Sequence, residues 1–172
     1  FFGIIKIKFF KKVGLMRKVI LYGFVILFLS ACSYSQIKNV SQRNNIMDTD
    51  RKFSSAYAEC EQNSEESRYL NDKINELLKN KKIYGKDIKI ECKISNYDEG
   101  SRALRYFISF GAGAAKAKIE VKLTDDNNQT ISTFSNDAIL PGGLFGGESK
   151  GVFDNAASGI VEYVKKTFID KK

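Results

Sequence analysis

The sequence has no histidine and no tryptophan among its 172 residues, and it has a single proline, Pro141. The absence of histidine excludes Ser–His–Asp and Cys–His catalytic sets and every His-ligated metal site. The three cysteines, Cys32, Cys60 and Cys92, form no Cys-x-x-Cys pair, which excludes a zinc ribbon and a dithiol redox motif. We therefore expect no catalytic residue, no metal, no cofactor and no enzymatic activity.

Acidic residues are missing from the first 31 residues, which hold six lysines and arginines. The whole chain has 28 Lys and Arg against 20 Asp and Glu, a formal charge of +8. Without this segment, 22 basic residues face 20 acidic ones, an excess of only +2. A nucleic-acid-binding domain usually carries a strong basic excess on its folded part, so nucleic acid is not expected as a partner.

Residues 1–31 have the pattern of an export signal. Met16 is followed by two basic residues, an apolar run over residues 19–29 and then small residues. This order is typical of a secretory signal peptide, and the run is shorter than the roughly 20 residues that a membrane-spanning helix needs. Met16 begins a complete signal without the residues before it. We therefore expect residues 1–15 to reflect an over-long gene assignment.

The segment Leu29-Ser30-Ala31-Cys32 resembles the lipobox of bacterial lipoproteins. That resemblance implies cleavage between Ala31 and Cys32 and covalent lipid on Cys32: a diacylglycerol thioether and a further acyl chain such as palmitate. Two or more acyl chains anchor a protein stably in a membrane. Ser33 resembles a context for sorting to the outer membrane, facing the periplasm. The alternatives are an ordinary signal peptide and a chance cysteine that follows an uncleaved anchor.

The remaining chain divides into a tether and one domain. Residues 32–50 are polar and without a clear period, which predicts a flexible tether after the lipidated cysteine. Residues 51–172 are long enough for a single globular domain. Within it, residues 51–60 fit the spacing of either a helix or a strand and weakly favour a strand, and residues 63–80 predict a helix capped by Asn63 and Glu66.

Alternation of apolar and charged residues predicts half-buried strands over residues 87–95 and 116–124, and a hairpin returns over residues 129–139. Asp125 and Asp126 fit a turn better than a calcium loop, because the Asp-x-Asp-x-Asp-Gly spacing is missing. A second helix follows from about residue 149. We expect an α/β (α+β) fold: a two-layer sandwich with a mostly antiparallel sheet of three to four strands and two helices on one face.

The connection between the two alternating strands, residues 96–115, is long, apolar and rich in glycine. It either completes the core or forms an exposed interaction patch. The candidate patch residues are Arg102, Leu104, Arg105, Tyr106, Phe107, Phe110, Gly111 and Gly113. A dinucleotide loop is not expected, because position 116 is Lys and an alternating strand follows. Glycine here allows unusual backbone angles or close approach.

Cys60 and Cys92 remain after Cys32 is lipidated. An exported protein can hold disulfides, and adjacent strands would bring the two Cα atoms within the required distance of about 7 Å. Two buried thiols are the alternative. Lysines also gather at the end of the first predicted helix, where cations are favoured by the helix dipole and need no partner.

The segments Gly100-Ser101-Arg102-Ala103-Leu104-Arg105, Gly111-Ala112-Gly113 and Gly142-Gly143-Leu144-Phe145-Gly146-Gly147 resemble a family of bacterial envelope lipoproteins classed as a domain of unknown function. The similarity covers about residues 53–168. It implies a small α/β domain whose layout is similar to the N-terminal domain of the Tol translocation protein and related periplasmic lipoprotein modules. The small residues Ser54, Ser55 and Ala56 depart from the first strand that the family implies.

These observations favour a membrane-anchored binding or structural module in the periplasm, held by lipid on Cys32. Its partner is expected to be an envelope protein or a second copy of the chain. One alternative is a carrier of a small apolar ligand, for which a closed apolar cavity would be the sign. The other is an envelope enzyme that works without histidine.

Overall fold

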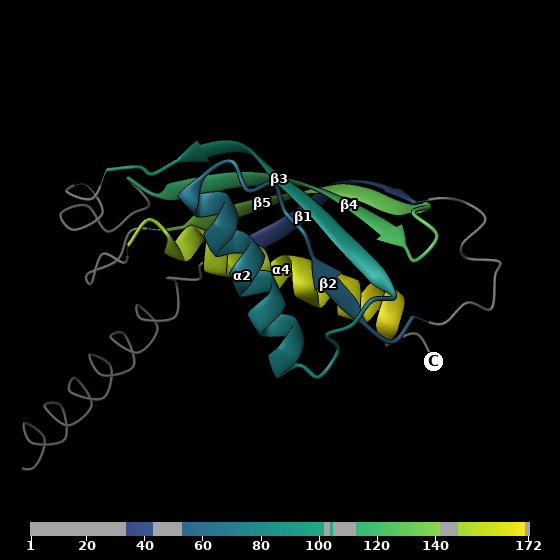
Figure 1. Ribbon diagram of the computed structural model, residues 1–172. Coiled ribbons are helices and arrows are strands. Elements are labelled where there is room, and N and C mark those ends of the chain that lie inside the picture. The colour runs from purple at the N-terminus through teal and green to yellow at the C-terminus, as the bar shows by residue number, and fades with distance from the viewer. Residues whose placement is uncertain (1–33, 43–52, 102–103, 105–112, 142–147, 171–172) are drawn as a thin grey trace, which may run out of the picture. The chain divides into compact units, whose positions relative to one another are not determined.

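The computed structural model describes residues 34–42, 53–101, 104, 113–141 and 148–170 (Figure 1). The chain divides into two units, residues 1–32 and 33–172, and all described residues belong to the second. The expected signal peptide, Ala31 and Cys32 lie outside the described residues. Within those residues, no helix combines the length and the apolar character that crossing a membrane requires.

Five strands form one sheet in the order β1-β5-β4-β3-β2. All neighbours are antiparallel except β2 and β3, which run parallel. The bounds are Tyr34–Gln42 for β1, Ala56–Ala58 for β2, Ile88–Asp98 for β3, Ala115–Asp125 for β4 and Thr130–Leu140 for β5. The β4–β5 connection is the predicted turn, where Asp125 Oδ1 accepts hydrogen bonds from the backbone N–H groups of Asn127 and Gln129.

Two helices cover one face of the sheet: α2, Glu65–Asn80, and α4, Gly151–Val164 (Figure 1). A π-helical turn, Lys165–Ile169, continues α4. The N-cap of α2 is Ser64, whose Oγ accepts from the N–H of Ser67 at 3.1 Å, so the expected cap at Asn63 is wrong by one residue. The two helices are tied by the hydroxyl of Tyr69, which donates to Asp154 Oδ1 at 2.9 Å.

The core lies between this face and the helices. The inward residues of β3 and β4 are those that the alternation predicts, and the apolar faces of both helices meet them, because side chains alternate across a strand and recur along one helix face. Phe153 of α4 is fully buried, and its ring lies 4.9 Å from that of Tyr97 at the end of β3. The expected α+β fold, with a mostly antiparallel sheet and two helices packed on it, is confirmed.

The expected number of three to four strands is too low, because β1 lies where we expect a tether. Tyr34–Gln42 is an edge strand whose register pairs Tyr34 with Ile139 and Gln42 with Ser132. An edge strand buries little: only Ile37 of β1 packs against the core, so the apolar alternation that marks β3 and β4 is missing. The tether interpretation is therefore wrong for residues 34–42.

Buried polar contacts hold β1 in place. Asn136 of β5 is fully buried, and its Nδ2 donates to Ser35 Oγ at 2.5 Å. Gln42 Nε2 donates to the hydroxyl of Tyr163 on α4 at 3.2 Å. These contacts fix both ends of β1 to the domain, which a hydrophobic pattern cannot reveal.

Candidate functional site

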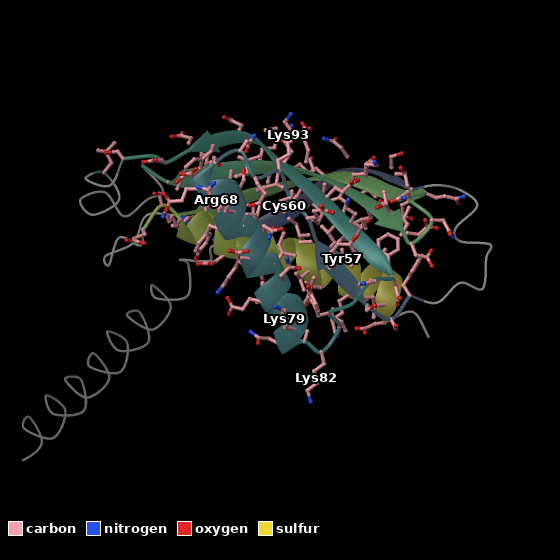
Figure 2. All side chains as sticks on the ribbon, in the orientation of Figure 1. Tyr57, Cys60, Arg68, Lys79, Lys82 and Lys93 are labelled. Atoms are coloured by element: carbon pink, nitrogen blue, oxygen red, sulfur yellow. A yellow bond between two sulfur atoms is a disulfide. The ribbon has the colours of Figure 1, made fainter. Side chains whose placement is uncertain are left out.

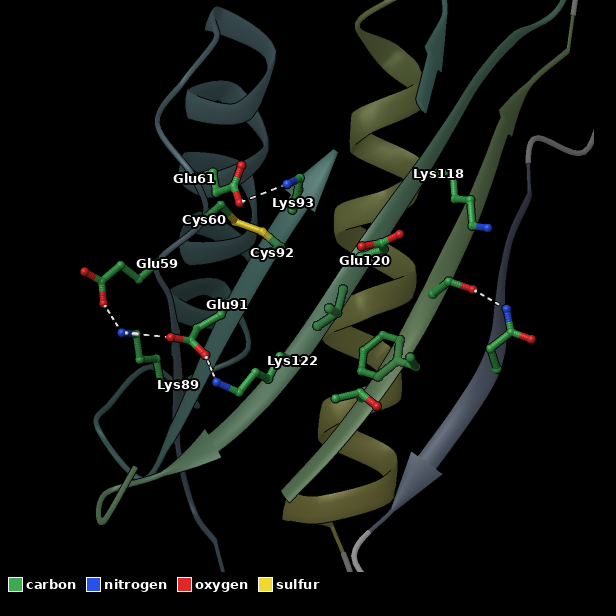
Figure 3. A pocket seen from close by; sticks show the side chains of 15 residues that line it. Glu59, Cys60, Glu61, Lys89, Glu91, Cys92, Lys93, Lys118, Glu120 and Lys122 are labelled. Carbon is green, nitrogen blue, oxygen red and sulfur yellow. Dashed lines mark hydrogen bonds and ion pairs between the residues drawn. A yellow bond between two sulfur atoms is a disulfide. The ribbon is translucent and has the colours of Figure 1, made fainter. Parts of the chain in front are cut away.

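The outward face of the sheet, the side away from the helices, carries an open hollow of about 760 Å³ (Figure 3). Its side chains come from β3, β4, β5 and the segment after β2. Asn39 of β1 also contributes, at the irregularity where the pairing of β1 with β5 shifts register between Lys38 and Ser41. Because every second residue of β3 and β4 turns to the core, the residues between them project outward together. The charged residues lining the hollow are Glu59, Glu61, Lys89, Glu91, Lys93, Lys118, Glu120 and Lys122.

Four of these residues form a continuous row of ion pairs across three segments (Figure 3). Lys89 Nζ lies 2.7 Å from Glu59 Oε2 and 3.3 Å from Glu91 Oε1. Lys122 Nζ lies 3.1 Å from the other carboxylate oxygen, Oε2 of Glu91. The row thus joins the segment after β2 to β3 and β4.

The pKa of Glu91 is shifted away from the range that suits a general acid. Partial burial raises the pKa of Glu91, but its hydrogen bonds to Lys122 and Lys89 outweigh that effect and leave the pKa below its ordinary value. The bond to Glu59 raises the pKa of Lys89. A general acid at neutral pH needs a carboxyl pKa raised towards 7, whereas Glu91 stays ionised. Among the described residues, no group of three or more Cys, Asp or Glu could hold a metal ion.

The charged residues of the hollow outside this row are only partly paired. Lys93 Nζ lies 3.6 Å from Glu61 Oε1, but Lys118 and Glu120 on β4 have no ion pair among the described residues. Lys118 is also exposed. This part of the hollow offers charges of both signs to a polar partner, and its lining is not that of a closed apolar cavity.

Cys60 and Cys92 are joined by a disulfide, with their Cα atoms 4.3 Å apart. Parallel pairing continues past β2, because the N–H groups of Glu59 and Glu61 donate to the carbonyls of Ile90 and Cys92, both at 2.9 Å. The sequence leaves the bridge and two buried thiols open. The pairing of β2 with β3 decides between them by placing both cysteines, each 4% exposed, side by side.

The structure describes only two residues of the predicted interaction patch. Leu104 is 44% exposed, and its N–H donates to Ser101 Oγ at 3.3 Å. Gly113 has a φ of +74°, an angle that favours glycine, as its place in a Gly-x-Gly segment leads us to expect. The other six lie outside the described residues: Arg102, Arg105, Tyr106, Phe107, Phe110 and Gly111.

The ends of this connection approach each other closely. Gly100 has a φ of +64°, and a Cβ added there would meet the carbonyl oxygen of Gly113 and lie 2.8 Å from the carbonyl carbon of Ala114. A side chain at position 100 would therefore push the two arms apart. The glycines before and after the connection let the chain leave β3 and enter β4 at adjacent points.

The basic cluster at the end of α2 is a solvated surface. Lys79 and Lys82 project from this end (Figure 2), and Lys79 Nζ lies 4.9 Å from the ring centre of Tyr84. Lys81 Nζ pairs with Glu162 Oε2 of α4 at 3.2 Å. These contacts, together with the helix dipole, account for the lysines without a ligand.

A family model matches residues 31–141, more than half of the chain, and its description is domain of unknown function (DUF4410). The chain belongs to this family. The expected membership of a domain family of unknown function is thereby confirmed at that level. The DUF4410 match differs in extent from the expected range of residues 53–168: it includes β1 and ends before α4.

Solved structures offer distant likenesses. The PelC dodecamer from Paraburkholderia phytofirmans matches with 10% identity and a TM-score of 0.46, covering 80% of this chain and 99% of that chain. A substituted form of the same protein gives a TM-score of 0.44. A protein from Caulobacter crescentus CB15, named a putative lipoprotein, has 11% identity and a TM-score of 0.41, covering 66% of this chain and 87% of that chain. No curated protein sequence matches.

Proposed function

We propose that the protein is a lipid-anchored module of the bacterial envelope that binds a partner and catalyses no reaction. The observation that carries this proposal is the sequence Leu29-Ser30-Ala31-Cys32 behind a basic and apolar leader. Lipid on Cys32 would hold the domain at a membrane surface. Ser33 supports the outer membrane, with the domain facing the periplasm.

The outward face supports binding over catalysis. Its carboxylates and lysines are mostly paired with each other, and Glu91 is held ionised rather than poised to donate a proton. Charged and hydrogen-bonding groups in an open hollow suit a polar protein surface better than a small apolar ligand. Envelope proteins and a second copy of the chain are the partners we propose.

The lipid anchor is tested by replacing Cys32. In Cys32→Ser, we expect no processing and no incorporation of an alkyne-labelled palmitate, because serine offers no thiol for the thioether. The matched control is Cys60→Ser/Cys92→Ser, which removes the other two cysteines and should keep the lipid. A Cys32→Ser protein that is still processed and still held in the membrane fraction would refute the anchor.

The partner is tested by photo-crosslinking in cells from two exposed described positions, Leu104 and Lys118, with Asp72 on α2 as the control. We expect a discrete adduct from at least one of the first two and none from Asp72. An adduct with the chain itself would identify self-association. The absence of adducts from both positions in membrane-held protein would contradict binding through these surfaces.

A further inference from the structure

The strand that follows the lipobox begins at one end of the sheet, which we call the anchor end. It comprises the ends of four strands in one row: Tyr34 pairs with Ile139, Ile139 with Lys116, and Lys116 with Asp98. Figure 1 shows β1, β4 and α4 beginning on this side and β3 and β5 ending there. The anchor end is therefore built from every strand except β2.

The length of the chain limits the distance between this end and the cysteine that the proposed function lipidates. Tyr34 is the second residue after Cys32, and an extended chain spans at most about 3.6 Å per residue, so the two Cα atoms lie within roughly 7 Å. The start of β1 is itself fixed, because Ser35 is bonded to buried Asn136 and Lys38 Nζ lies 2.8 Å from Asp137 Oδ2. A connection of two residue spacings thus joins the proposed lipid site to the first strand of the sheet.

Two side chains at the anchor end, those of Tyr34 and Lys116, suit a lipid interface. Tyr34 is 52% exposed, and tyrosine is enriched where membrane meets water, since its ring is apolar and its hydroxyl is polar. Lys116 is exposed and has no ion pair among the described residues, so its ammonium group can meet a lipid phosphate. The exposure of a tyrosine does not by itself show which end of the sheet faces the membrane, because Tyr84 is 50% exposed at the opposite end, just before β3 begins.

We propose that the anchor end rests on the headgroup surface of the membrane that holds the lipid, with the strands directed away from it. This inference rests on the proposed lipid at Cys32 and adds an orientation to it. The nine residues of β1 extend about 30 Å at a rise of about 3.3 Å per residue. Tyr84 and the β4–β5 turn then lie on the side away from the bilayer, and the charged hollow faces sideways, open to a partner beside it.

The orientation is tested with single labels on the acylated full chain in vesicles of phosphatidylethanolamine and phosphatidylglycerol. Lys116→Cys and Lys122→Cys place a fluorophore on the same face of the same strand, about 20 Å apart. The natural Cys60 and Cys92 are bridged and do not react. With nitroxide on the lipid headgroups, we expect several-fold stronger quenching at position 116 than at position 122. Equal quenching, or stronger quenching at position 122, would overturn the orientation.

Two controls separate this inference from the anchor itself. Flotation of the labelled protein with the vesicles reports the anchor: protein that fails to float contradicts the lipid, whereas floating protein with equal quenching contradicts only the orientation. A Gly-Ser insertion of about ten residues between Ser33 and Tyr34 adds a span of roughly 18 Å. It should leave flotation intact and abolish the difference between the two labels. If the difference in quenching between positions 116 and 122 persists, the short connection between Cys32 and Tyr34 does not set the orientation.

Tyr34→Ser tests the interfacial contact directly. We expect it to keep the acylated protein on the vesicles and to reduce quenching at position 116, because an apolar ring is lost from the interface. Val40→Ser, at another exposed apolar position of β1, is the matched control and should leave the quenching unchanged. If Tyr34→Ser and Val40→Ser change the quenching at position 116 equally, Tyr34 does not contact the membrane interface.

Discussion

Gly159 of α4 is the residue on which the fit of β1 against the helix depends. A Cβ at this position would meet Ser35 Oγ and lie 2.8 Å from Ser35 Cβ and 3.0 Å from Asn136 Nδ2. Both neighbours are short side chains held by their mutual hydrogen bond, so they have little room to yield. The glycine serves close packing here, because helical backbone angles would suit alanine equally well.

Gly159→Ala is therefore expected to destabilise the protein despite the better helix propensity of alanine. Overpacking costs about 1–3 kcal/mol, and the gain in propensity is about 1 kcal/mol, so a net loss of up to about 2 kcal/mol should appear in urea unfolding. Ser158→Ala, at the exposed neighbouring position, is the control and should change the free energy of unfolding little. Equal stability of Gly159→Ala and the parent would show that β1 can move aside without cost.

Asp87 joins the start of β3 to the segment before β2. Its Oδ2 accepts from the hydroxyl of Ser54 at 2.7 Å and from the N–H of Ser54 at 2.9 Å. The bonds from Ser54, then those from Ser55, lower the pKa of Asp87 below its ordinary value of 3.8. A carboxyl group whose pKa is lower in the folded state stabilises the fold above the ordinary value, and this stability is lost as the pH falls through the folded-state pKa.

Asp87→Asn should therefore cost about 1 kcal/mol at pH 7, and the difference from the parent should shrink below pH 3.8. Unfolding by urea at a series of pH values measures it. Glu120→Gln, which replaces an exposed carboxylate without an ion pair among the described residues, is the control and should change the free energy of unfolding at pH 7 little. A constant difference across the whole pH range would contradict the role of the Asp87 charge.

At the scale of the elements, the disulfide fastens the short strand β2 to the sheet. β2 has three residues and pairs with a single strand of the sheet, β3, whereas the disulfide closes a loop of 32 residues that contains all of α2. Closing such a loop restricts the unfolded chain and is worth about 3–4 kcal/mol. We expect dithiothreitol to lower the free energy of unfolding by about this amount, and Cys60→Ser/Cys92→Ser to be insensitive to it. Equal unfolding curves with and without reductant would contradict the bridge.

The elements also show which patterns can be read from a sequence. β3 and β4 were predictable because isoleucine, valine and leucine alternate with lysine and glutamate, and α2 because its leucines recur on one face. β1 was not predictable, since an edge strand held by Ser35, Ile37 and Gln42 has no such alternation. The short β2 was only weakly indicated by three small or aromatic residues.

At the scale of the whole molecule, the outward face was predictable in composition but not in arrangement. Alternation alone places Lys89, Glu91 and Lys122 outward. The ion pair of Lys89 with Glu59 and the bridge between the cysteines both depend on the parallel pairing of β2 with β3. The sequence does not indicate the order of the strands, so the pairing of β2 with β3 could not be predicted from it. The interaction patch predicted from residues 102–113 stays a prediction, and only Leu104 and Gly113 of its members are among the described residues.

The pairing of the first strand with the last has a consequence for how the chain folds. Ser35 and Asn136 are hydrogen-bonded although they lie 101 positions apart in the sequence. In contrast, β3, β4 and β5 are consecutive strands, each paired with the next one along the chain. Contacts between distant parts of a chain form slowly, because the loop between them must first be closed. We therefore expect the three central strands to assemble first and β1 to dock late, so the edge of β5 stays uncovered until residues 34–42 pair with it.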